Sequence, residues 1–195
     1  MRTVRTSTQD AWPEISAAIA AARVSDQVRP EIVLDDVPAP IRLATHALAV
    51  SGEIMDGELE LAHGRLVLLH EPAGQETWQG NTRFVIFIKA VLEPDLATDP
   101  LLLEVGWEWL TEALAARGVA ELALSGTVSR TGSQAFGEIA EREPEGAIEV
   151  RASWTMQPAD VASGLLAWCD LLATAAGLVP LSEGVSALPA KRTSR

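Results

Sequence analysis

Apolar residues near the start of the chain recur at the spacing of one helix face. From Trp12 to Ala22 they follow steps of three and four residues, which predicts an amphipathic helix over residues 8–24. Ser7, with Asp10 three residues later, forms an approximate capping box. We therefore expect the first element to be a helix that packs one side against the rest of the molecule.

A proline-rich connector and then strand-like segments follow this helix. The connector runs from Pro30 to Pro40, and its three prolines favour extended chain. Turn-forming residues separate three segments rich in Ile, Val, Leu and Phe, which we predict as strands: residues 41–54, 58–70 and 82–93. Both faces of the third segment are largely apolar, which predicts a central strand that is covered on both sides.

The second half of the chain alternates helix and strand again. Asp99–Pro100 and Gly118 carry the signals of a helix start and a helix end, so we expect a helix between them. Two further strands and a last helix are predicted at residues 119–131, 147–156 and 159–176. The chain then ends in an extended tail, residues 179–195.

This pattern predicts a single α+β domain over residues 7–178, with the order α-β-β-β-α-β-β-α. We expect a twisted antiparallel sheet of about five strands with helices packed on it. Each half ends in a helix whose tryptophan lies nine residues before a glycine, at Trp109–Gly118 and Trp168–Gly177. An internal duplication would explain this likeness, and so would the general similarity of two hairpin–helix units.

The chain is strongly acidic, which argues against some classes of binding partner. It has 195 residues, of which 27 are Asp or Glu and 15 are Lys or Arg, giving a net charge of −12. Residues 6–190 contain all 27 acidic residues but only ten basic ones, so this body carries −17. Because such a body repels phosphate backbones, we expect no nucleic-acid binding.

Sequence features also predict the cellular compartment in which the protein resides. No apolar run has the roughly 18 residues of a membrane span, and the first residues lack the apolar stretch of a secretory signal. The single cysteine, Cys169, excludes an internal disulfide. We expect a cytoplasmic protein that does not associate with a membrane.

The connection after the predicted strand 58–70 contains several polar side chains close together in the sequence. It brings the imidazole of His70, the amide of Gln75 and the ring of Trp78 together with two carboxylates, and loops on a rigid scaffold often carry function. The alternative is an ordinary turn shaped by proline and glycine. We expect His70, Gln75 and Trp78 to project from one end of the sheet.

Arginines within the predicted strands offer a second candidate site. They are Arg65, Arg130 and Arg151, and any two that shared a sheet face would form an anion or carboxylate site. We place Arg65 lower on the strand that leads to His70, with Arg130 close enough to share its surface. Ion pairs with neighbouring glutamates are the ordinary alternative.

The sequence lacks the patterns of metal, cofactor and nucleophile sites. His63 and His70 are seven residues apart on one predicted strand, which places them on opposite faces and argues against a shared zinc. Cys169 lies in the middle of a helix beside Trp168, as a small core residue would. We therefore expect no bound metal, no cofactor and no familiar enzyme class.

Six blocks of sequence carry a resemblance to a known family. They are residues 36–40, 64–76, 104–107, 151–154, 167–172 and 175–178. Over about residues 10–190 the chain resembles an actinobacterial family, the domain of unknown function 3000. The resemblance implies an actinobacterial source and a single domain, and it implies no activity and no site residue.

Together these features predict a binding module that contacts a protein partner, or a second copy of itself, through the sheet or the 70–81 loop. The acidic body suits a basic peptide. One alternative is a small-molecule sensor, which would need an enclosed cavity. The other is an enzyme of unfamiliar class that uses the His70 loop, with His70 beside a carboxylate at the floor of a deep pocket.

Overall fold

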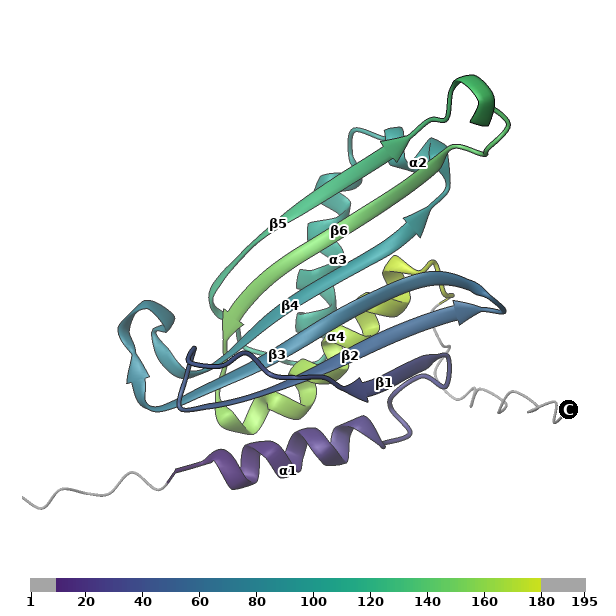
Figure 1. Ribbon diagram of the computed structural model, residues 1–195. Helices are drawn as coiled ribbons and strands as arrows, with labels where there is room; N and C mark the ends of the chain where they lie inside the picture. The colour runs from purple at the N-terminus through teal and green to yellow at the C-terminus, as the bar shows by residue number, and fades with distance from the viewer. Residues whose placement is uncertain (1–9, 180–195) are drawn as a thin grey trace, which may run out of the picture.

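The structure is a computed structural model that describes residues 10–179, and it consists of one antiparallel sheet with helices on one side (Figure 1). The strands are β1 (Ile32–Asp36), β2 (His46–Asp56), β3 (Leu59–Gln75), β4 (Gly80–Leu92), β5 (Leu122–Ser133) and β6 (Glu145–Thr155). The helices are α1 (Trp12–Arg23), α2 (Pro94–Thr98), α3 (Leu102–Ala116) and α4 (Val161–Ala175). Short 3-10 turns lie at Glu76–Trp78, Gly137–Ile139 and Pro158–Asp160. The predicted α+β class and antiparallel sheet are confirmed.

The sheet has six strands instead of about five, in the order β1-β2-β3-β4-β6-β5. The additional strand, β1, lies inside the proline-rich connector that we predicted to be merely extended. Its five residues contain no proline, so none of its hydrogen bonds to β2 is lost over the paired residues, from Ile32 opposite Ile54 to Asp36 opposite Val50. The short helix α2 was also not predicted.

Some predicted boundaries shift for local reasons. α1 begins at Trp12, where the carboxylate of Asp10 accepts the backbone N–H of Trp12 at 3.0 Å. The predicted cap at Ser7 and most of the predicted tail lie outside the described residues. The predicted strand 41–54 begins only at His46. Both hairpin–helix units are present, and their common origin stays a prediction.

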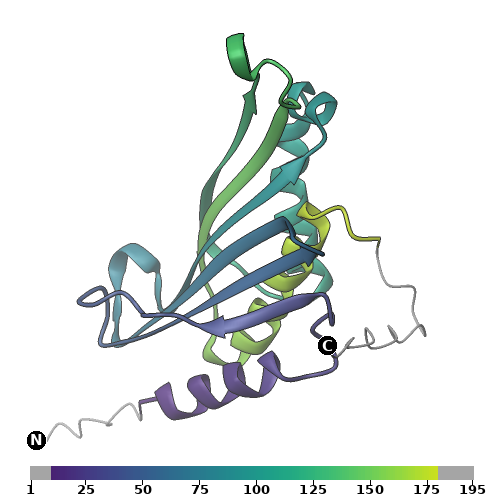
Figure 2. The same ribbon diagram turned by 45° about the vertical axis from the view of Figure 1, so that its right-hand side comes forward.

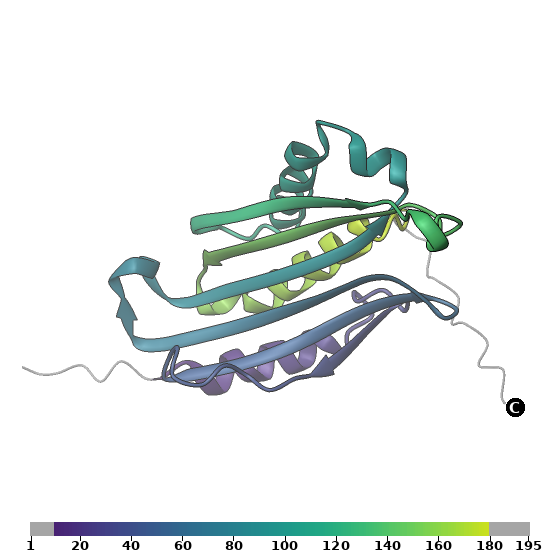
Figure 3. The same ribbon diagram turned by 45° about the horizontal axis from the view of Figure 1, so that its top comes forward.

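The helices form a single layer on one face of the sheet, as Figure 3 shows from above. α4 lies across the central strands β2, β3 and β4, between α1 on one side and α3 on the other. Most of its residues are buried, and the ring of Trp168 is fully buried against Gly52 and Gly64. Within residues 10–179 no helix is long and apolar enough to cross a membrane.

The opposite face of the sheet is covered at one end only. The connector after β1 first extends the pairing with β2, where Val37 donates to the carbonyl of Ala49 at 3.2 Å, and then crosses this face, where Pro38 accepts a hydrogen bond from Arg65. Ala49 and Leu69 are buried although they point away from the helices. Beyond them the face is open, and the tip of the β3–β4 hairpin lies at the same end of the sheet as the connector before β2 (Figure 2). We call the helix-free side of the sheet the open face.

Candidate functional site

The open face exposes apolar residues of the central strand β4. The prediction that β4 is covered on both sides is wrong, because Val85 is 38% exposed and Val91 49% exposed on this face. The other face of β4, which includes Phe84, Ile86 and Ile88, is buried under α4 as expected. An apolar surface at the centre of a sheet that nothing in the described chain covers is a candidate contact site.

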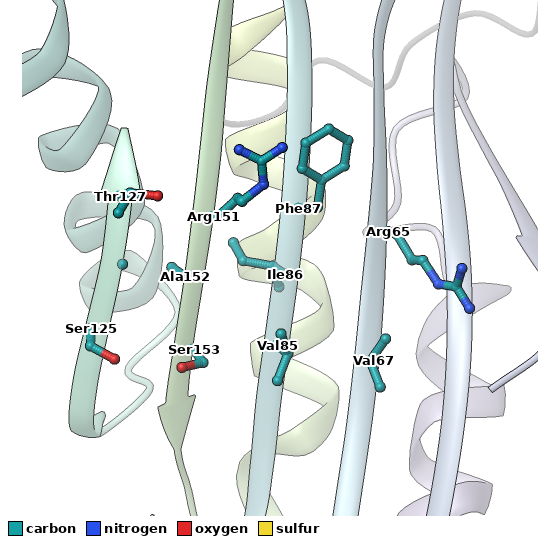
Figure 4. Close-up of a pocket in the computed structure, with 11 residues that line it drawn as sticks. Arg65, Val67, Val85, Ile86, Phe87, Ser125, Thr127, Arg151, Ala152 and Ser153 are labelled. Atoms are coloured by element: carbon teal, nitrogen blue, oxygen red, sulfur yellow. The ribbon is translucent and has the colours of Figure 1, made fainter. Parts of the chain in front are cut away.

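A shallow groove of about 570 Å³ crosses this open face (Figure 4). Val67, Val85 and Phe87 form its apolar floor. Hydroxyl groups stand along one side, from Ser125 and Ser153 among others. The full lining is Arg65, Val67, Val85, Ile86, Phe87, Ser125, Gly126, Thr127, Arg151, Ala152 and Ser153. The strands β3, β4, β6 and β5 therefore all contribute to one surface.

Two arginines lie on this surface, one on each side of β4. The guanidinium of Arg151 lies 5.0 Å from the centre of the Phe87 ring, a cation–π contact, and it pairs with Glu149 at 2.8 Å. Arg65, opposite Phe87 on β3, donates to the carbonyl of Pro38 in the connector. Arg65 and Arg151 thus share a sheet face, and Arg151 also forms the ion pair with Glu149 that was the ordinary alternative.

A third arginine lies at the end of the groove and was not predicted. Arg83 is half-buried on the open face, and it donates to Ser153 Oγ at 2.7 Å and to Thr155 Oγ1 at 3.1 Å. Burial lowers the pKa of this guanidinium. The sequence did hold a signal, because Arg83 alternates in phase with Val85 and Phe87 on the uncovered side of β4.

The residues predicted to form one site are separated. Arg65 lies on the open face, whereas His70 points to the helix side and is 1% exposed. Arg130 lies on the edge strand β5, on the helix side, and donates to the carbonyl of Asp99. Two strands, β4 and β6, separate Arg130 from β3. The structure therefore does not place Arg130 on the surface of Arg65.

The tip of the β3–β4 hairpin holds the remaining predicted residues. Gln75 ends β3 and pairs with Gly80, and Trp78 follows in the turn. The ring of Trp78 is half-buried and is not among the apolar side chains packed against the core. Gln79 adopts a left-handed backbone conformation, with φ of 57°, that closes the turn. Gln75 and Trp78 thus lie at the end of the sheet that β3 reaches after His70.

His70 belongs to a separate cluster that fastens α1 to the sheet. Its Nδ1 lies 2.9 Å from Thr82 Oγ1, and its Nε2 lies 3.5 Å from an Asp10 carboxylate oxygen. The same carboxylate lies 2.6 Å from His46 Nε2. The Trp12 ring stacks on the His46 ring at 5.0 Å between centroids. Neither His46 nor Asp10 was expected here, because their contacts join segments far apart in the sequence.

The surroundings of His70 can be compared with what the alternative of an enzyme using the His70 loop requires. That alternative required a carboxylate beside His70 and a pocket that exposes the imidazole. The carboxylate of Asp10 is present, but His70 is buried beneath α1. Cys169 is also buried, which raises the pKa of its thiol to about 12 and disfavours the nucleophilic thiolate.

Comparison with known proteins gives a family match. Neither a curated protein nor a solved structure matches the chain. The family described as protein of unknown function DUF3000 matches residues 11–186, which is most of the chain. The chain therefore belongs to the DUF3000 family.

Proposed function

We propose that this protein is a binding module that contacts a protein partner through the open face of its sheet. The observation that carries the proposal is the uncovered apolar floor of the groove, formed by Val67, Val85 and Phe87. Sheets with one open face normally present polar residues there, so exposed apolar residues at the centre of a sheet favour a contact surface. Two arginines beside this floor fit such a role, since arginine and aromatic residues are enriched in interfaces.

The form of the groove favours a protein over a small molecule. Small-molecule sites usually enclose most of their ligand, whereas this groove is a shallow depression across four strands. A partner segment could lie along it without entering a cavity. We place this activity in the cytoplasm of an actinobacterium, on the basis of the sequence resemblance and the single free cysteine.

Site-specific photocrosslinking tests the contact surface. We expect p-benzoylphenylalanine at Val85, incorporated in cells of the native organism, to give a defined adduct with one partner protein. The matched control is the same amino acid at Val24, which is 86% exposed and lies at the end of α1. Equal adducts from both positions, or none from Val85, would contradict the proposal. An adduct of twice the protein's own mass would assign the surface to self-association instead.

A second variant separates the open face from the hairpin tip. We expect Trp78→Ala to change the free energy of unfolding by less than about 1 kcal/mol, because Trp78 is half-buried outside the core. If the tip also contacts the partner, this variant weakens binding. Thermal unfolding and the yield of the Val85 adduct measure the two effects. A large loss of stability would show that Trp78 has a structural role.

A further inference from the structure

We propose that the groove recognises an acidic, apolar segment of its partner, with a carboxylate at the Arg83–Ser153 corner and an apolar side chain on Val85 and Phe87. This inference rests on the proposed function and specifies the chemistry of the partner. It reverses the expectation from net charge, which favoured a basic peptide.

The first argument is the local charge. Among the described residues that line the groove, two are arginines and none is acidic. The body between residues 6 and 190 has ten basic residues and 27 acidic ones, yet four of the ten face this side of the sheet. These four are Arg65, Arg83, Lys89 and Arg151. Arg151 has the Glu149 carboxylate as its ion-pair partner, whereas Arg65 and Arg83 form no ion pair among residues 10–179, so in a chain of this composition the groove is complementary to an anion.

The second argument is the state of Arg83. Its hydrogen bonds go to Ser153 Oγ, Thr155 Oγ1 and the carbonyl of Ala123, which are all uncharged acceptors. Among residues 10–179 it forms no ion pair, although it is half-buried in a strongly acidic protein. Holding a partly buried cation without a counterion is costly, so a carboxylate from outside would stabilise it. Ser153, which lines the groove, joins Arg83 to that surface.

The third argument is the position of the apolar floor. Val85 lies next to Arg83 on the same face of β4, and Phe87 follows under the Arg151 guanidinium. The hydroxyl groups of Ser125 and Thr127 stand across the groove from β3, where the Arg65 side chain points away from the floor (Figure 4) and donates to the carbonyl of Pro38. A segment with Asp or Glu beside Leu or Phe would place its carboxylate at Arg83 and Ser153 and its apolar side chain on the floor.

A display experiment tests this assignment without knowledge of the natural partner. Random 12-residue peptides on phage are selected on the wild-type protein, and enriched peptides are synthesised for fluorescence anisotropy. We expect enrichment of Asp or Glu beside a large apolar residue. Binding to the double variant Arg83→Gln/Arg151→Gln should be at least about tenfold weaker, because charge-assisted hydrogen bonds are lost. Arg142→Gln, which removes an exposed arginine from the β5–β6 loop, should bind like the wild type.

Two controls separate a loss of peptide binding from a loss of folding and from binding that does not depend on charge. Arg151→Gln alone changes an exposed side chain, so it reports on binding even if loss of Arg83 impairs folding. Replacing the peptide's acidic residues by Lys should abolish binding. Enriched peptides without acidic residues, equal binding to the double variant, or no enrichment would each overturn the inference. The Val85 photocrosslink is independent of these peptides, so it still decides whether the open face contacts a protein.

Discussion

Replacing Trp168 with alanine is expected to lower the free energy of unfolding by about 3–5 kcal/mol, the largest effect of any single substitution considered. Trp168 lies in α4 at the centre of the helix layer and is fully buried. Its ring packs where Gly52 and Gly64 lack side chains, and a Cβ at Gly52 would lie 2.8 Å from the ring. Truncation therefore leaves a cavity that these glycines have no side chains to fill. Urea unfolding followed by circular dichroism measures the change.

Two comparisons identify the cause of this loss. The indole Nε1 of Trp168 has no hydrogen-bond partner among the described residues, so Trp168→Phe removes ring volume without breaking a bond and should cost clearly less than Trp168→Ala. Trp109→Ala removes a half-buried ring from α3 and should also cost less. If Trp168→Ala were no worse than Trp109→Ala, the glycine-bounded packing of Trp168 would not be central to stability.

Hydrophobic periodicity in the sequence predicted the helix layer and most of the sheet. The alternation of β6 and the steps of three and four residues in α3 and α4 depend on neighbours close in the chain, and the structure has these elements. β1 was missed because the prolines on both sides of it dominate the local pattern. Pairing with β2, which no local pattern reveals, makes it a strand.

The candidate site shows a different limit of sequence reasoning. The apolar face of β4 was correctly identified, but the sequence does not state whether another element covers it. Burial in a helix layer and exposure in a binding groove require the same Val and Phe residues. Arg65 and Arg151 could be assigned to strands, yet their common face depends on the register through β4, and Arg130 fell on the other face.

The His70 cluster was predictable only in part. The imidazole of His70 was selected because of its polar neighbours in the sequence, whereas its real neighbours come from α1 and β2. Stacking of Trp12, His46 and His70 joins three elements, and such contacts follow from tertiary packing alone. The cluster is therefore a feature of how α1 docks, and we expect its buried imidazole to make stability depend on pH.

Between pH 7.5 and 5.0, the wild-type protein is expected to lose stability as the pH falls, by up to about 1.4 kcal/mol per pH unit for one proton. Burial lowers the pKa of His70, although the nearby carboxylates of Asp10 and Glu71 act in the opposite direction. His46 also faces this imidazole and disfavours its charge. Below the unfolded pKa of about 6.5, the unfolded chain binds a proton that the folded protein resists. Stability therefore falls from that pH down to the folded pKa of His70.

The substitution His70→Asn should remove most of this dependence, because the amide can still reach Thr82 but does not titrate. Urea unfolding at half-unit pH steps gives the slope for the wild type and for His70→Asn. The pKa of Asp10 is also lowered. Burial acts to raise this pKa, but the hydrogen bonds from Trp12 and His46 outweigh burial and lower it. Asp10 therefore stays ionised between pH 7.5 and 5.0. Its contribution to the free energy of unfolding is lost only at lower pH. An unchanged slope in His70→Asn would show that another group controls the acid sensitivity of the fold.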